Sequence, residues 1–237
     1  MTTRMRVTTI EQTANAMAEL SNGTDPSMLH ALRAAALSPR VKLMCNAGYA
    51  TALCPWRNDP LPGREELIGI LAQATRTDGS GKPAWGLMQS HIDTLYAVDA
   101  FWFGRGNWST VAEDIGNDLD SQRAWRCGMN SLIRGMGFKT LSWAAFIYSP
   151  GTCQLLTLDS WHARRLQVDG TLLARDNSAS HALYEQLESL TIAEVNTLYP
   201  GYMSTVGAAC LWYNVRNSGP ESHAGLNCRV QESEVAA

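Results

Sequence analysis

The sequence predicts an all-α protein, and three observations lead to that class. Apolar residues return at helical spacing in most long segments; in REELIGILAQA they fall at Leu67, Ile68, Leu71 and Ala74. The alternation of apolar and polar residues that marks strands is weak throughout the chain. Clusters of Pro, Gly and Asn separate the helical segments and predict the loops between them.

In the first half of the chain, helices alternate with loops that contain Pro and Gly. Segments 46–63 and 79–86 are predicted loops because Pro, Gly and Asn are frequent in them. Asp120 or Ser121 is a candidate N-cap for the helix that precedes the glycine turn described below. Helices are predicted at 9–22, 26–38 and 64–77, and two or three more within 87–103 and 108–136.

The second half continues the helical pattern around one extended stretch. A very apolar helix is predicted at 139–149, and PGTCQLLTL at 150–158 is predicted to be extended. This stretch stops at Asp159, so Asp159 or Ser160 is the candidate N-cap of the next helix. The remaining helices are predicted at 160–168, at 178–191 and within 192–219.

Composition indicates a globular protein with no global preference for nucleic acid. The 237 residues are 45% hydrophobic and 17% charged, which suits one large domain or two small lobes. The net charge of −3 argues weakly against a nucleic-acid partner. Any such partner must therefore be bound by locally clustered basic residues.

The cysteines and the apolar runs predict no metal centre and no membrane anchor. None of the six cysteines forms a CxxC pair or a His/Cys cluster with zinc spacing, so we expect reduced thiols and no metal. Only Cys210 and Cys228 lie near the C-terminus, so we expect no iron–sulfur cluster. The N-terminal segment lacks the apolar core of a signal peptide, and no run of about 18 apolar residues exists. We expect a monomer in the cytoplasm of a bacterium or of a virus-infected cell.

A glycine turn links two predicted helices in SLIRGMGFKTLSW. Glycines let the backbone turn sharply and expose successive amides, which together with a helix N-terminus can bind a phosphate oxygen. Arg134 and Lys139 flank Gly135, Met136 and Gly137 with positive charge. The alternative is an ordinary helix–helix turn with a C-capping glycine.

The stretch IRGMGFKT…LLTLDSWHARRL resembles the helix–hairpin–helix DNA glycosylases with a downstream catalytic aspartate, the group of endonuclease III and the 8-oxoguanine glycosylases. Their motif is roughly L-P-G-x-G-x-K-T-A, a spacer, and V-D-[TV]-H-x-x-R. Arg134 stands where the motif has proline, and Trp161 is inserted before the histidine. The matching residues are Gly135, Gly137, Lys139, Thr140, Asp159, His162 and Arg165.

A second segment, EELIGILAQATRTD, is similar to the part of endonuclease III in which a glutamine fills the hole left by a flipped base. That glutamine corresponds to Gln73. The resemblance covers 65–166, with the helix–hairpin–helix at about 126–148. It implies that 1–237 forms a single two-lobed helical unit with the active-site cleft between its lobes.

The resemblance also implies roles for individual residues. Asp159 would stay ionised and stabilise positive charge on the sugar, while Lys139 would attack C1′ as a neutral amine, which requires burial. A Schiff base on Lys139 would add lyase activity; Asp159 with water alone would give a glycosylase without it. The implied contacts to double-stranded DNA are Gln73, Arg134, Gly135, Met136, Gly137, His162 and Arg165. Phe138, Trp143 and Trp161 are candidates for the base pocket, and a monovalent cation is possible at the hairpin.

Each of these roles has a structural alternative. Lys139 could be a phosphate contact or a solvated charge, and Asp159 could be an N-cap only. Gln73 could be a polar residue on a buried helix, and the basic residues after Asp159 could form structural ion pairs. Each aromatic candidate could instead be core, including Trp85, which could also stack on a flipped base.

Three functions follow from these residues. The first is a DNA glycosylase, with or without lyase activity. The second is a DNA-modifying transferase on the same fold, which replaces an activated 5-hydroxymethyl group of thymine or uracil with an amino acid or amine, as relatives in bacterial viruses are thought to do. The third is a DNA-binding module without catalysis. For the transferase, candidate contacts to the amine co-substrate are Arg57, Asn214, Arg216 and Asn217.

Overall fold

The computed structural model describes residues 9–11, 14, 27–39, 43–76, 79–104, 108–174 and 177–217. Within these ranges the regular secondary structure is helical. The one β-bridge among the described residues is the isolated antiparallel bridge between Thr75 and Pro83. The predicted all-α class is confirmed. Most of the helix predicted at 9–22 lies outside the described residues.

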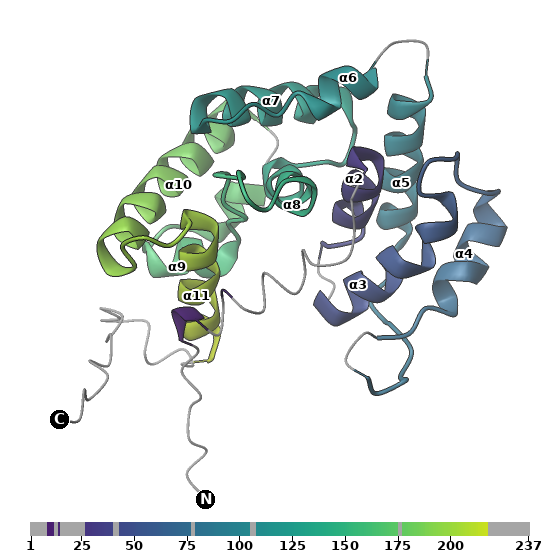
Figure 1. Ribbon diagram of the computed structural model, residues 1–237, viewed down its shortest axis with the longest axis horizontal. Helices are drawn as coiled ribbons and strands as arrows, with labels where there is room; N and C mark the ends of the chain where they lie inside the picture. Colours follow the sequence, from purple (N-terminus) through teal and green to yellow (C-terminus); the bar gives the residue numbers. More distant parts are fainter. Residues whose placement is uncertain are drawn as a thin grey trace, which may run out of the picture. The chain divides into compact units, whose positions relative to one another are not determined.

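The chain divides into two compact units (Figure 1). The first unit is Thr24–Leu155, and the second unit combines Met1–Gly23 with Leu156–Ala237. The first unit contains α2 Met28–Ala36, α3 Leu43–Ala52, the 3-10 turn η1 Cys54–Trp56, α4 Arg64–Ala72, α5 Gln89–Trp102, α6 Trp108–Glu113, α7 Leu119–Leu132 and α8 Phe138–Tyr148.

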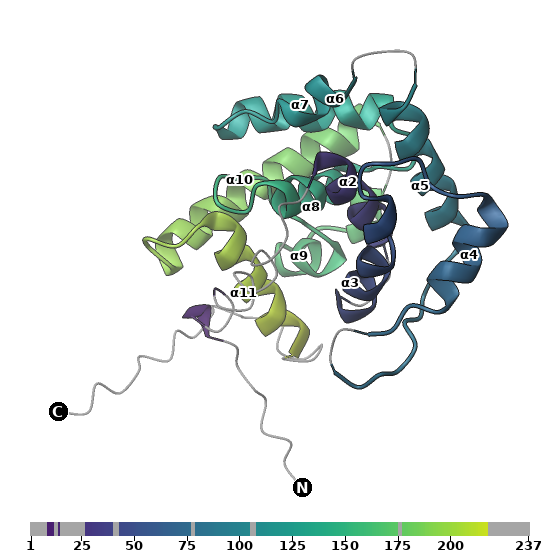
Figure 2. The same cartoon turned by 45° about the vertical axis from the view of Figure 1, so that its right-hand side comes forward.

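Helix α2 is the centre of the first unit. All nine of its residues are buried, and it packs against α8, α5 and α3. Both Figure 1 and Figure 2 show α2 between α8 and α5. The sequence MLHALRAAA suits this position because the alanines let neighbouring helices approach closely while Leu29 and Leu32 fill the core.

A buried ion pair ties α2 to α5 and to the loop around η1. Arg33 Nε donates to Asp99 Oδ1 at 2.8 Å, and the same guanidinium donates to the carbonyls of Trp56 and Asp59. Asp99 Oδ2 accepts the backbone N–H of Leu61 at 2.7 Å. Burial lowers the pKa of Arg33, and the Asp99 carboxylate acts in the opposite direction. The pair thus satisfies backbone groups of an irregular loop as well as two buried charges.

The predicted loop at 46–63 is wrong in its first part, because α3 continues to Ala52. Cys45, Tyr49 and Leu53 are buried at helical spacing. Gly48 lies inside this helix because a Cβ there would come 2.0 Å from the carbonyl oxygen of Thr75. This glycine serves a close contact between α3 and the chain after α4; it does not mark a turn.

Two further boundaries differ from the predictions. Asp118 caps α7, so neither Asp120 nor Ser121 is the N-cap; its side chain accepts the N–H of Ser121 at 2.9 Å. In the second unit, the predicted break between 191 and 192 is absent, because one helix runs through it. The second unit contains α9 Ser160–Arg165, η2 Gly170–Ala174, α10 Ser178–Leu198 and α11 Ser204–Asn217.

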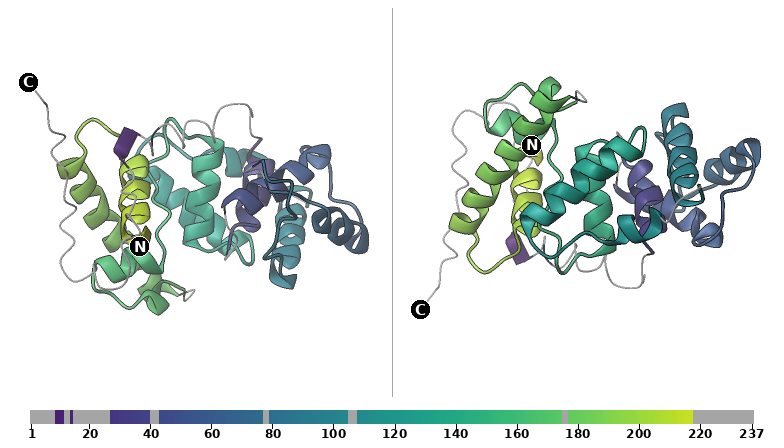
Figure 3. Two further views of the ribbon diagram at one scale, coloured as in Figure 1. Left: turned by 90° about the horizontal axis from the view of Figure 1, so that it is seen from below. Right: turned by 90° about the horizontal axis from the view of Figure 1, so that it is seen from above.

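Helices α10 and α11 form the main contact of the second unit. They lie side by side in both views of Figure 3. Gly207 of α11 makes this crossing close, since a Cβ there would meet Val195 of α10 at 2.2 Å. None of the helices in the described ranges is long and apolar enough to cross a membrane.

The buried pair gives the first stability prediction. Asp99→Asn leaves the Arg33 guanidinium buried without its counter-charge, so we expect the first unit to lose about 3–5 kcal/mol in free energy of unfolding by urea denaturation. Asp93→Asn on the same helix is the control, because Asp93 pairs with Arg64 at the surface, where both side chains are exposed. That variant should lose less than about 1 kcal/mol. Equal losses would show that the buried pair is no more important than the exposed one.

A buried histidine gives a prediction on pH. His91 is 2% exposed; its Nδ1 accepts the N–H of Met88 and its Nε2 meets the carbonyl of Pro39, each at 2.9 Å. Burial lowers the pKa of His91 below the value in the unfolded chain. The unfolded chain therefore binds more protons, so stability is complete above the unfolded pKa of about 6.5 and falls as pH decreases below it. We expect urea midpoints to decrease between about pH 7.5 and about pH 5, with a smaller slope in His91→Gln; an equal slope would contradict the assignment.

Candidate functional site

The turn between α7 and α8 is held in one conformation by its first glycine. Gly135 has a φ of 89°, and a Cβ there would meet Thr94 Oγ1 of α5 at 2.5 Å. Met136 is fully buried, and its carbonyl accepts from Asn130 Nδ2 at 3.1 Å. Met136 therefore anchors the turn in the core, and its side chain is not a DNA contact. Gly135 is explained by the turn itself.

The second glycine of the turn has no such explanation. Gly137 is the N-cap of α8 with φ −71° and ψ 170°, a conformation open to every residue. No heavy atom lies within 4 Å of an added Cβ, and no side chain caps the helix. Ser, Asn or Asp would stabilise this position by a few tenths of a kcal/mol more than glycine does. The first amides of α8 are consequently left without a side-chain cap, beneath open space.

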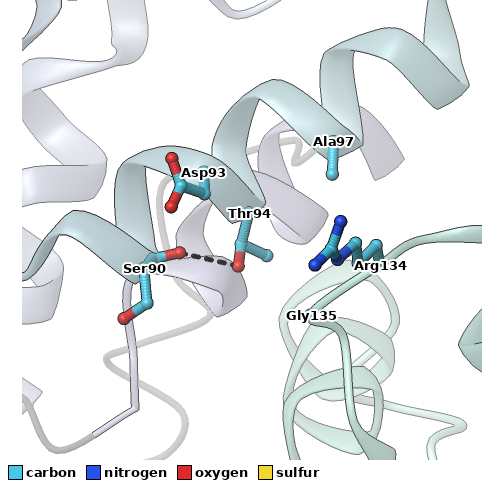
Figure 4. Close-up of a pocket in the computed structure, with 6 residues that line it drawn as sticks. All are labelled: Ser90, Asp93, Thr94, Ala97, Arg134 and Gly135. Carbon is cyan, nitrogen blue, oxygen red and sulfur yellow. Dashed lines mark hydrogen bonds between the residues drawn. The ribbon is translucent and has the colours of Figure 1, made fainter.

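Basic side chains flank this helix start. Arg134 and Lys139 are both exposed. Figure 4 shows Arg134 and Gly135 across a groove from α5, where Ser90, Asp93, Thr94 and Ala97 form the opposite wall, so one carboxylate faces the basic side of the groove. Lys139 occupies the second position of α8.

Asp159 is the N-cap of α9, and its carboxylate has donors from two helices. Oδ1 accepts the backbone N–H of Trp161 at 2.8 Å, with the N–H of His162 at 3.4 Å. Oδ2 accepts the indole Nε1–H of Trp212 on α11 at 2.8 Å. The Asp159 side chain stays 17% exposed. These N–H donors fix the orientation of the carboxylate.

The segment that leads to Asp159 is held by α10. Glu188 is fully buried, and its Oε1 accepts the N–H of Leu156 at 2.9 Å. The Tyr184 hydroxyl accepts the N–H of Leu158 and donates to the carbonyl of Leu156, each at 2.8 Å. These side chains supply the backbone partners that a neighbouring strand would provide in a sheet. The position of Asp159 is thereby fixed from the side of α10 as well as α11.

His162 and Arg165 have structural partners within the second unit. His162 is 4% exposed; its Nδ1 accepts the N–H of Asp159, and its Nε2 lies 3.3 Å from the carbonyl of Ala208. The same Nδ1 also lies 3.3 Å from Asp159 Oδ1. Arg165 forms a bidentate ion pair with Glu194 of α10. Arg165 therefore forms a structural ion pair, which is the alternative to a DNA contact given above. Both ring nitrogens of His162 contact partners inside the second unit.

The aromatic candidates divide between core and surface. Phe138 is buried against the Arg126 guanidinium, 4.6 Å from the ring centroid, so it is a core residue and does not line an open pocket. Trp143 is half-buried and stacks on Phe146. Trp161 is half-buried beside Asp159, with the Arg164 guanidinium 5.0 Å from its ring centroid.

The predicted site residues are divided between the two units. Gln73, the hairpin residues and Lys139 belong to the first unit; Asp159, Trp161, His162 and Arg165 belong to the second. Gln73 is exposed at the end of α4, so it is not on a buried helix face. Arg57 is half-buried at the end of η1, and the side chains of Asn214, Arg216 and Asn217 lie outside the described residues.

Three residues of the site could not be recognised from sequence alone. Glu188 and Tyr184 lie in the segment YEQLESL. The sequence does not distinguish Glu188 from Glu185, although only Glu188 is fully buried. Trp212 is 53 residues from the carboxylate that it contacts. A spacing of four residues between Tyr184 and Glu188 places both on one helix face, which is the only signal that the sequence offers.

Across the parts of the chain that the structure describes, no three His, Cys, Asp or Glu residues come together in a way that could hold a metal ion. Comparison with family models, with curated proteins and with solved structures found no match.

The two glycines of the turn give a matched prediction. Gly135→Ala must place a side chain at positive φ against Thr94, and we expect a loss of about 2 kcal/mol or more in free energy of unfolding. Gly137→Ser adds a good N-cap in open space, and we expect an unchanged or higher melting temperature. Thermal melts followed by circular dichroism test both variants. A Gly137→Ser protein that melts as low as Gly135→Ala would contradict the open start of α8.

Proposed function

We propose that the protein is a DNA glycosylase that flips a modified or damaged base out of the duplex and cleaves its N-glycosidic bond. The resemblance of 65–166 to helix–hairpin–helix glycosylases supports this proposal. The observation that carries it is the carboxylate of Asp159, held in one orientation by N–H donors of α9 and α11 while still partly exposed. Asp118, which caps α7, accepts the backbone N–H and the hydroxyl of Ser121, and no indole of the described residues donates to it.

The chemistry requires a fixed negative charge beside the sugar. As the C1′–N bond breaks, its electron pair leaves with the base, and positive charge develops on C1′ and the ring oxygen. The ionised Asp159 stabilises that charge without reorganising, because its donors are already in place. Water then adds at C1′ and loses a proton, and the products are the free base and an abasic site. The glycosidic bond is accessible only in an extruded nucleotide.

The hairpin supplies a plausible contact to the DNA backbone. The uncapped start of α8 presents backbone N–H groups, and the exposed Arg134 and Lys139 add positive charge around it. Phosphate oxygens are bound by such amides and cations without regard to base sequence. We assign Lys139 to this contact, because its exposed side chain lies in the first turn of α8, beside the uncapped amides. The glycosylase is then monofunctional, and lyase activity is the competing outcome.

A transferase on the same fold is the second candidate, and the same hairpin favours it. A cation beside an uncapped helix start suits a pyrophosphate leaving group as well as a DNA phosphate. In that reaction an amine or amino acid replaces the pyrophosphate on a 5-hydroxymethyl base, and the glycosidic bond stays intact. The two functions therefore differ in which bond breaks.

The test is base release from duplexes that carry 5-hydroxymethyluracil, an oxidised base or a mispair. We expect abasic sites with the wild-type protein and a loss of about a hundredfold or more in rate for Asp159→Asn. Asparagine remains a good N-cap, so the protein should stay folded. Asp118→Asn is the matched control, because it changes an N-cap carboxylate that has no indole partner, and its rate should equal that of the wild type.

Borohydride separates the roles of Lys139. We expect no trapped covalent adduct, and an adduct that disappears in Lys139→Gln would instead make Lys139 the nucleophile. Gly137→Ser should weaken DNA binding without lowering stability, because its hydroxyl occupies the amides of α8. If no substrate yields an abasic site, and a pyrophosphorylated 5-hydroxymethyl base gains the mass of an added amine, the transferase is the function.

A further inference from the structure

A groove lies between α5 and the turn that precedes α8, both in the first unit (Figure 4). Its volume is about 380 Å³, which is within the usual range for sites that bind small molecules. One wall is a face of α5, where the lining residues recur at helical spacing, and the other wall is the start of the turn. The lining residues are Ser90, Asp93, Thr94, Ala97, Arg134 and Gly135.

The two walls are held together where Gly135 meets α5. A Cβ on Gly135 would lie 2.5 Å from Oγ1 of Thr94 and 3.4 Å from its Cγ2, so only glycine allows this approach. Thr94 Oγ1 is itself fixed, because it donates to the carbonyl of Ser90 at 2.8 Å. A ligand in the groove would therefore not have to order the two walls, which lowers the cost of binding.

The walls carry opposite charges that do not pair with each other. On the α5 wall, Asp93 Oδ1 accepts from Arg64 and, at 3.3 Å, from Gln89 Nε2, whereas Oδ2 accepts from no donor among the described residues. On the other wall, the guanidinium of Arg134 is exposed and forms no ion pair or hydrogen bond with the part of the chain that the structure describes. One carboxylate oxygen and one guanidinium of the same groove are thus both available to a ligand.

We propose that this groove binds a small dipolar molecule of the amino-acid class, with a carboxylate at one end and an ammonium at the other. The inference does not rest on the proposed DNA chemistry, because the groove belongs to the first unit and Asp159 to the second. Arg134 binds the carboxylate of the ligand through two parallel N–H donors, an arrangement for which the guanidinium is well suited. Asp93 Oδ2 accepts from the ammonium, and the Ser90 hydroxyl adds a further acceptor.

The placement of the charges favours a dipolar ligand over a simple anion. Arg64 and Asp93 cancel each other, so Arg134 leaves the groove with one net positive charge. A phosphate dianion on Arg134 would also approach the carboxylate of Asp93, which repels it. An ammonium end is attracted by the same carboxylate, and Arg64 competes with it for only one of the two oxygens.

The test is a titration of the isotope-labelled full chain with glycine, β-alanine and γ-aminobutyrate, followed by NMR through the backbone amide signals of Ser90, Asp93 and Gly135. The series increases the separation of the two charged ends step by step. We expect one member to shift these signals and to bind about tenfold or more tightly than acetate, methylamine or inorganic phosphate, because each of those probes is attracted to only one wall.

Variants that remove one charge assign each end of the ligand to one wall. Asp93→Asn should weaken binding of the preferred amino acid about tenfold and leave acetate unchanged, whereas Arg134→Gln should weaken both. Arg64→Gln should bind the amino acid at least as tightly as the wild type, because it removes the cation that competes for Asp93. Asp120→Asn is the matched control, because Asp120 is an exposed aspartate in the first turn of α7 and does not line the groove.

The inference is overturned if no dipolar probe shifts these signals, or if the preferred amino acid binds no more tightly than acetate. It is also overturned if Asp93→Asn leaves the affinity for the amino acid unchanged, or if inorganic phosphate is the tightest probe, since the groove is then a simple anion contact. None of these outcomes affects the glycosylase proposal, which is tested by base release without any amino acid. A protein that releases no base but binds the amino acid through both walls leaves this inference standing.

Discussion

The placement of Asp159 depends on how an extended segment without a neighbouring strand satisfies its backbone. Leu156 and Leu158 are buried, so their N–H and C=O groups cannot rely on water. Glu188 and Tyr184 of α10 provide the partners instead. Loss of either would leave buried polar groups unpaired, at a cost of about 1–3 kcal/mol each. The geometry of the carboxylate is therefore a consequence of buried polar side chains on a helix behind it.

In the first unit, buried polar side chains satisfy the backbone groups of irregular segments at two places. The Arg33–Asp99 pair satisfies the loop around η1 through two carbonyls and the N–H of Leu61. Gln122, which is fully buried on α7, donates to the carbonyl of Thr152 and accepts the N–H of Gln154. A helical protein with irregular connections must bury such groups wherever the connections pass through its core. Each of these polar side chains is consequently structural, although its residue type resembles that of a functional one.

The same fact explains which features the sequence predicts and which it does not. Apolar periodicity reports which face of a helix is buried, and it located most helices. It also separated the segment before Asp159, which lies outside the helices, from its helical neighbours. A glycine in the sequence can indicate a position at which no side chain is tolerated, but the sequence does not give the reason. At Gly135 the reason is the turn, and at Gly48 it is the contact with Thr75. Buried Glu188 and distant Trp212 depend on tertiary neighbours, and no local pattern encodes those.

Gly137 is the position at which folding and function can be separated. Its backbone conformation suits any residue, a serine there would stabilise α8, and nothing in the described chain fills the space above it. A residue that is worse for stability than an available alternative, in a turn that is otherwise rigid, indicates a constraint from outside the folded chain. We propose that a phosphate close to the amides of α8 imposes that constraint, because any side chain at this position would occupy the same space. The carboxylate of Asp159 and the open start of α8 thus support the proposed function independently of each other, each within its own unit.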